Sequence, residues 1–130
     1  KCTKGQELVI GGFTAPKGSR SGFGSLLLGA YNENAEFRYL GRVGSGFDQN
    51  LLSDLTVKLK RAKMKESPFE ISSPSGKDIT WVKPTLVAQI DFTEWTKDKV
   101  LRHPVFMGLR EDKAAKDVVL EEPGSAVTAS

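Results

Sequence analysis

The hydrophobic and polar positions of the chain follow a strand period near both ends and a helical period between them. Toward the beginning, three runs rich in β-branched and aromatic residues are separated by glycine, proline and asparagine, which favour turns. The runs cover residues 7–14, 23–31 and 35–44. Because consecutive strands usually lie side by side, the pattern predicts three strands in a meander.

A change of period near residue 48 predicts a helix. Between residues 48 and 65, apolar side chains recur at helical spacing and fall on one face. They are Leu51, Leu52, Leu55, Leu59 and Ala62. Asp48 precedes the first of them and is a suitable N-cap. Lysines and arginines crowd the second half, where cations suit the helix dipole, so we expect a solvated face there rather than a ligand site.

Strand character returns after a loop that contains two prolines. Residues 79–82, 86–96 and 100–110 predict two or three further strands. Three strands, a helix and two more strands form the order of the OB-fold, a five-stranded Greek-key barrel with a helix between strands 3 and 4. The expected fold class is therefore all-β with one helix, although a β-sandwich or an SH3-like barrel has a similar order.

Composition excludes several classes of protein. The chain has 130 residues, the size of one domain, of which 38% are hydrophobic and 27% charged. No apolar stretch reaches the length of a membrane span, and no signal-peptide pattern opens the chain. One cysteine, Cys2, and one histidine, His103, cannot build an internal disulfide or a four-ligand zinc site. We expect no metal site, a reducing cytoplasmic setting and, since no Met begins the chain, a piece of a longer protein.

The net charge of +3 hides an asymmetry along the chain. Residues 1–110 carry 17 lysines and arginines against 11 acidic residues, whereas residues 111–130 carry two against five. A basic body with an acidic tail indicates a polyanionic partner, although many basic domains bind none.

Three separated stretches resemble one family. They are KCTKGQELVIGGFTAPKGSRSGFGSLLLGAY (residues 1–31), WVKPTLVAQIDFTEWT (81–96) and LRHPVFMGLREDKAAKDV (101–118). Together they are similar to the C-terminal OB domain of ATP-dependent DNA ligases, and in particular of bacterial DNA ligase D. The resemblance implies an OB-fold domain over residues 1–119, followed by a flexible linker or tail over residues 120–130.

The sequence REDK, residues 110–113, is similar to the end of nucleotidyl transferase motif VI. In the family, the OB domain closes over the ATP pocket of a neighbouring adenylation domain, and motif VI orients the leaving pyrophosphate. The resemblance implies catalytic roles for Arg110 and Lys113, an orienting role for Asp112 and none for Glu111. The chemistry agrees, because guanidinium and ammonium groups neutralise phosphate oxygens. On charge pattern alone, a solvated turn is the commoner alternative.

Other roles are implied by position in the same family. Lys1 is similar to the last lysine of motif V, which contacts the nucleotide phosphate. The glycine-rich residues 16–24 are similar to the part of the ligase OB domain that faces the minor groove of nicked duplex DNA. The residues expected to contact DNA are Lys17, Ser19, Arg20 and Ser21, together with Arg38 and Arg42, which strict alternation places on one face of the third strand.

The resemblance also implies partners and limits. The ligase nucleophile lies in a Lys-x-Asp-Gly motif, which the sequence lacks, so we expect no self-adenylation or sealing by this chain alone. ATP and Mg²⁺ would be held through the adenylation domain. The full protein would act in end joining in the bacterial nucleoid, with Ku and with polymerase or nuclease domains. Serving both ATP and DNA implies a swivel about a hinge near residues 1–6.

Other functions stay open. A free-standing OB module for single-stranded nucleic acid would bind an oligonucleotide without any adenylation domain. The OB domain of an mRNA capping enzyme would act with GTP on RNA ends, but residues 8–24 favour the DNA ligase. A domain that binds only protein would leave REDK without a role.

Overall fold

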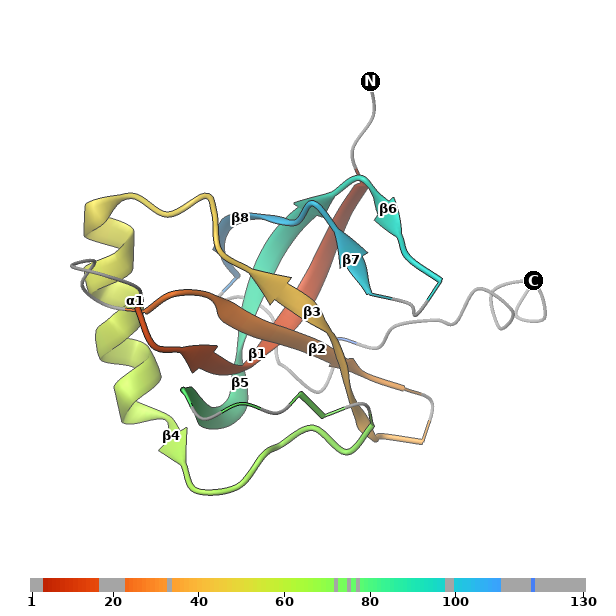
Figure 1. Cartoon of the computed structure of the whole chain (residues 1–130), viewed down its shortest axis with the longest axis horizontal. Coiled ribbons are helices and arrows are strands. Elements are labelled where there is room, and N and C mark those ends of the chain that lie inside the picture. The colour runs from red at the N-terminus through yellow and green to blue at the C-terminus, as the bar shows by residue number, and fades with distance from the viewer. Residues whose placement is uncertain are drawn as a thin grey trace.

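The computed structural model describes residues 4–16, 23–32, 34–71, 73–74, 76, 78–97, 100–110 and 118. Strands dominate, and one helix packs beside the sheet (Figure 1). In chain order the elements are β1 (Lys4–Thr14), β2 (Leu26–Tyr31), β3 (Phe37–Val43), α1 (Gln49–Arg61), β4 (Lys63–Met64), β5 (Ile79–Phe92), β6 (Glu94–Trp95), β7 (Leu101–Arg102) and β8 (Val105–Leu109). Among these residues, no helix has the length and apolar character needed to cross a membrane.

One antiparallel sheet has the strand order β3–β2–β1–β5–β4, and β8 also pairs with β5. The helix follows β3 and precedes β5, as the sequence predicts. The barrel is not closed, because no strand pairing joins β3 to β8 within the described ranges. One backbone hydrogen bond, from the Phe106 N–H to the Ser45 carbonyl at 3.0 Å, crosses this opening. Of the two-residue strands, β4 is additional to the expected strands, whereas β6 and β7 lie within the expected strands 86–96 and 100–110.

Strand β5 is continuous over 14 residues, where the pattern predicts two shorter strands. Its pairing with β1 shifts from Ile10 opposite Leu86 to Gly12 opposite Trp81. Residues 82–85 therefore lie opposite a single residue of β1 and form a bulge, although Val82 stays buried and pairs with Lys63 of β4. Pro84 lies in this bulge, where a residue without an N–H group is tolerated.

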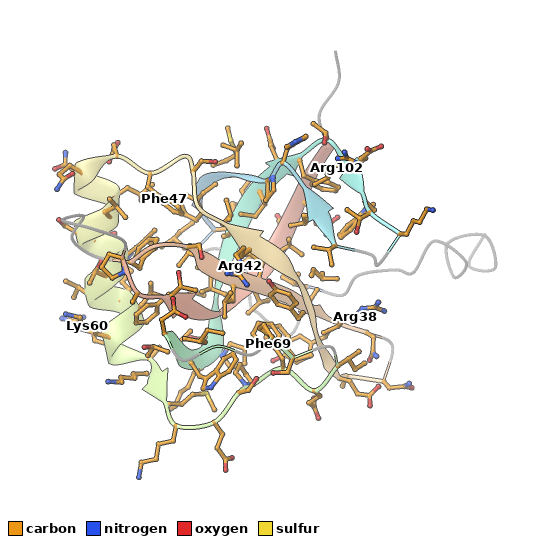
Figure 2. The ribbon with its side chains drawn as sticks, in the orientation of Figure 1. Arg38, Arg42, Phe47, Lys60, Phe69 and Arg102 are labelled. Atoms are coloured by element: carbon orange, nitrogen blue, oxygen red, sulfur yellow. The ribbon has the colours of Figure 1, made fainter. Side chains whose placement is uncertain are left out.

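The helix is fixed by its cap and its apolar face. The Asp48 carboxylate accepts a hydrogen bond from the Leu51 N–H at 2.7 Å, which confirms the predicted N-cap. The buried side chains of the helix are Leu52, Leu55 and Leu59. Lys60 lies on the outer side of the helix (Figure 2), so the basic second half is solvated as expected.

Alternation along β1 and β5 separates an inner from an outer face. Leu8 and Ile10 of β1 and Ala88 and Ile90 of β5 are fully buried in the core. Gln89, which lies between Ala88 and Ile90 on β5, is only partly buried, whereas the pair Val9 and Val87, two positions further along the same side, is buried. We call the side that carries Glu7, Gln89 and Asp91 the outer face, since it leads to the candidate site.

An aromatic cluster covers another part of the sheet. Phe69 stacks on Phe37 with ring centroids 4.7 Å apart and meets Trp81 edge-on at 6.0 Å. The rings approach the backbone closely, because an ideal Cβ on Gly29 would lie 2.7 Å from the Phe69 ring and 2.4 Å from the Arg38 carbonyl oxygen. Glycine is therefore required at this point of β2 for steric reasons.

The last predicted strand is divided in two. Residues 100–110 form β7 and β8, separated by His103 and Pro104. The residue before a proline favours extended backbone, and we expect that of His103. The structure corrects this expectation, since His103 has φ of 52° in the left-handed region. The turn it makes carries the chain from the β6–β7 hairpin back to β5.

Candidate functional site

A bulge in β8 sets the direction of Arg110. Phe106 lies opposite Ile90 and Gly108 lies opposite Gln89, so Met107 is an extra residue in the ladder. Gly108 has φ of 153°, a conformation that suits glycine. Bulges often turn a following side chain toward a functional site. Arg110 follows directly, and its N–H donates to the Val87 carbonyl at 2.8 Å.

The side chain of Arg110 lies over the outer face. Its Nη1 donates to Glu7 Oε2 at 2.8 Å and to Gln89 Oε1 at 3.4 Å. Glu7 and Gln89 are opposite each other in the β1–β5 ladder. The side chain of Arg110 is 37% exposed and that of Glu7 is 25% exposed. The ion pair therefore fixes the arginine without removing it from solvent.

Two exposed apolar side chains lie on the same strand. Val105 and Met107 flank the buried Phe106 and are 39% and 56% exposed. Val105 lies opposite Asp91, which places it on the outer face. Among the described residues, only Val57 is a further large hydrophobic side chain with comparable exposure. A charged tip beside exposed apolar groups is typical of a surface that meets another surface.

Most of the residues predicted to contact phosphate or DNA lie outside the described residues. They are Lys1, Lys17, Ser19, Arg20, Ser21, Asp112 and Lys113. Their roles stay predictions. The segments that contain them adjoin described elements, since residues 17–22 connect β1 to β2 and residues 111–117 follow Arg110.

The two arginines of β3 do not share a face, contrary to the expectation from alternation. Tyr39 lies opposite Gly29 and Gly41 lies opposite Leu28, so Leu40 is an extra residue in β3. This bulge reverses the alternation between Arg38 and Arg42. Arg42 is exposed, whereas Arg38 is half-buried near the start of the strand (Figure 2). Their predicted DNA contacts would therefore have to be made on different sides of the strand.

The sequence reasoning missed Glu7 and Gln89. Neither residue belongs to a motif, and both are separated from Arg110 by long stretches of chain. Only the register of β1, β5 and β8 brings them together. The available signal was a carboxylate and an amide among apolar residues of two strands, since polar residues at alternate positions mark the outer face of a half-buried sheet.

The described residues show one shifted pKa and no cluster of metal ligands. Burial, and secondarily the Glu70 carboxylate, raise the pKa of Tyr31 above its ordinary value. In these residues no three His, Cys, Asp or Glu side chains gather as metal ligands.

The last described residue, Val118, is held against β2. The backbone N–H of Tyr31 donates a hydrogen bond to the carbonyl of the buried Val118 at 3.1 Å. The predicted domain boundary at residue 119 stays a prediction.

Comparison with known proteins gives the family. The family model described as the ATP-dependent DNA ligase C-terminal region matches residues 19–113. The chain is 39% identical over 127 residues to the multifunctional non-homologous end joining protein LigD of Pseudomonas aeruginosa. It is 43% identical over 119 residues to the LigD DNA repair protein of Mycobacterium tuberculosis. The DNA ligase of the archaeon Hyperthermus butylicus is 35% identical over 127 residues.

Solved structures agree with the sequence matches. The crystal structure of the ligase domain of M. tuberculosis LigD has a TM-score of 0.83 and 42% identity, and the match covers 93% of this chain and 40% of that one. A mycobacterial DNA ligase D complexed with ATP and MES has a TM-score of 0.79 and 40% identity, with 93% and 39% covered.

The matched relatives are much longer than this chain. The matches cover 95% and 89% of the chain but only 15% and 16% of the P. aeruginosa and M. tuberculosis LigD proteins. They cover 85% of the chain and 21% of the H. butylicus ligase. On the family match and these identities, the chain belongs to the family of ATP-dependent DNA ligase C-terminal regions.

Proposed function

We propose that this chain is the OB-fold domain of an ATP-dependent DNA ligase that repairs breaks by end joining. In this proposal it binds nicked duplex DNA and supplies motif VI to an adenylation domain during enzyme–AMP formation. The observation that carries the proposal is the placement of Arg110. It directly follows β8, lies over the outer face and stays partly exposed, and the same strand carries the exposed side chains of Val105 and Met107.

The role of motif VI follows from the charge of the reaction. When a lysine of the adenylation domain attacks the α-phosphate of ATP, negative charge develops on the departing pyrophosphate. Arg110 and Lys113 would neutralise that charge, and Arg110 could do so through paired N–H donors. Asp112 would orient these cations. Mg²⁺ would add to the neutralisation, held with ATP in the adenylation domain, and Lys1 would contact the nucleotide phosphate.

The exposed apolar pair supports docking to a protein surface. Met107 is 56% exposed and Val105 is 39% exposed, so the strand that leads to Arg110 presents two apolar side chains to an approaching surface. Since Met107 lies three residues before Arg110, a surface that receives Arg110 would also cover Met107. A swivelling domain needs such a surface, because it is covered in one pose and exposed in the other.

DNA binding is the second part of the proposal. Lys17, Ser19, Arg20 and Ser21 would contact the phosphate backbone, and Arg42 is exposed and available to add to them. The described aromatic side chains do not support an alternative as a single-stranded binding module. Each of them is buried or only partly exposed, whereas a stacking platform presents open ring faces to the bases.

The experiment compares an adenylation domain alone with the same domain joined to this chain. Joining should accelerate enzyme–AMP formation from ATP. The Arg110→Ala and Lys113→Ala variants should each lose most of that acceleration, by roughly 100-fold for removal of one charge-stabilising donor. A joined chain that gives no acceleration would refute the role of motif VI.

A further inference from the structure

The carboxylate of Glu7, which lies near the beginning of the chain, holds Arg110. Glu7 Oε2 lies 2.8 Å from Arg110 Nη1. Gln89 adds a second, longer contact to the same nitrogen at 3.4 Å. The orienting role was predicted for Asp112, which lies outside the described residues. Within them, the carboxylate beside Arg110 is that of Glu7.

The two acceptors are themselves rigidly placed. Glu7 and Gln89 face each other in the middle of the β1–β5 ladder, which pairs residues from Lys4 to Thr14. Their neighbours Leu8 and Ala88 are fully buried, so neither strand can turn without exposing the core. The position of Glu7 relative to β8 is therefore set by main-chain hydrogen bonds rather than by a loop.

A fixed partner matters because an arginine side chain has several rotatable bonds. Binding a phosphate with a mobile arginine costs rotamer entropy, and a partner that already orders the side chain removes part of that cost. The arginine stays 37% exposed in the pair, so a ligand can still reach it. An ordered but reachable guanidinium is what a charge-stabilising group requires.

We propose that Glu7 is a positioning residue, which holds the guanidinium of Arg110 in the orientation that meets the nucleotide phosphates. The inference rests on the proposed function of Arg110. Glu7 acts on the nucleotide through Arg110, by accepting a hydrogen bond from Nη1, and does not itself touch the nucleotide. The opposite possibility is that the carboxylate competes with phosphate for the arginine, in which case removing it would speed the reaction.

The test measures single-turnover enzyme–AMP formation against ATP concentration, with this chain joined to its adenylation domain. Glu7→Ala should lower the limiting rate about five- to tenfold, equivalent to about 1 to 1.4 kcal/mol. Glu7→Gln should stay within about twofold of the parent, because its amide oxygen accepts from the same Nη1. Sealing of a pre-adenylated nick should change little in both variants.

A double-mutant cycle separates positioning from a general structural effect. If Glu7 acts only through Arg110, the Glu7→Ala and Arg110→Ala double variant should be no slower than Arg110→Ala alone. Glu94→Ala is the matched control, because Glu94 pairs with Arg102 at 3.3 Å on the β6–β7 hairpin. Removing that pair should leave the adenylation rate unchanged.

The outcomes distinguish this inference from the proposed function. Arg110→Ala without any effect on adenylation would refute the proposed function. If Arg110→Ala slows adenylation and Glu7→Ala does not, only the positioning role is overturned. The same holds if the rate losses of the two single variants multiply in the double variant. Faster adenylation in Glu7→Ala would also overturn the positioning role, in favour of competition. If Glu7→Ala does not fold, Glu7→Asp decides, since its shorter reach should slow adenylation and an unchanged rate would contradict positioning.

Discussion

The replacement of Gly29 by alanine tests the packing of the sheet on which the site is built. An ideal Cβ at this position would lie 2.4 Å from the Arg38 carbonyl oxygen, 2.7 Å from Phe69 Cε1 and 3.0 Å from Phe37 Cζ. Real Cβ atoms do not approach heavy atoms so closely, so the backbone or both rings must move. The carbonyl belongs to the neighbouring strand β3 and cannot shift without disturbing the β2–β3 ladder.

The magnitude follows from two opposing effects. Overpacking a close contact costs about 1 to 3 kcal/mol. Replacing glycine in a strand interior returns about 0.5 to 1 kcal/mol, because the unfolded chain loses conformational freedom. The rigid carbonyl places the cost near the upper end of its range, so the net loss should be about 2 kcal/mol. For a domain of this size, that lowers the melting temperature by about 6 to 10 °C.

The assay is thermal unfolding of the chain followed by circular dichroism, with Gly44→Ala as the matched control. A Cβ at Gly44 would lie 3.4 Å from the Gly24 carbonyl oxygen and 3.6 Å from Ser25 Cβ, which are ordinary contacts. Gly44→Ala should therefore match or slightly exceed the parent in stability. Of these two glycines, only Gly29 has a steric conflict with an added Cβ. Equal melting temperatures for the two variants would therefore refute the reasoning.

Three further predictions concern the helix cap, the DNA contacts and alkaline stability. Asp48→Ala removes the acceptor of the Leu51 N–H and should cost about 1 kcal/mol in urea unfolding; an unchanged midpoint would show that the cap is not needed. Arg20→Ala should weaken nick binding and make its dependence on salt concentration shallower, because fewer counterions are released; an unchanged slope would remove Arg20 from the DNA surface. The pKa of Tyr31 is raised in the folded chain, so the unfolded chain loses the phenol proton at lower pH. The free energy of unfolding should therefore decrease as pH rises above about 10. The Tyr31→Phe variant should show a smaller decrease. Equal slopes for the parent and Tyr31→Phe would contradict the assignment.

Features that depend on local sequence were predicted well. The helix, its Asp48 cap and its buried leucines follow from the spacing of apolar residues and from one capping side chain. The first three strands follow from short apolar runs between turn residues, and their bounds differ by only a few residues. The placement of the helix before the long β5 also follows from the order of these patterns.

Features that depend on bulges or on distant strands were not predicted. The joining of two runs into β5 depends on a bulge around Pro84, and the separation of Arg38 from Arg42 depends on one extra residue in β3. A single inserted residue reverses the alternation without leaving a clear trace in the sequence. The contact between Glu7 and Arg110 depends on the registers of β1, β5 and β8 together, which no local pattern contains.

The site itself was predicted only through resemblance. The sequence REDK has the composition of an ordinary charged turn, and its family likeness is what points to phosphate chemistry. The structure adds that Arg110 is paired with Glu7, is partly exposed and follows a strand that carries exposed apolar side chains. These are physical requirements of a group that must meet a charged ligand at a protein surface, and they could not be obtained from composition or spacing.

The most direct test of the central claim measures two steps on one preparation of the Arg110→Ala ligase. One measurement is the rate of enzyme–AMP formation, and the other is the rate of sealing a pre-adenylated nick. If Arg110 acts on the departing pyrophosphate, the first rate should fall by roughly 100-fold while the second falls by less than about threefold. Equal losses in the two rates would contradict the account, because they would show that Arg110 serves the fold or DNA binding instead of the phosphates.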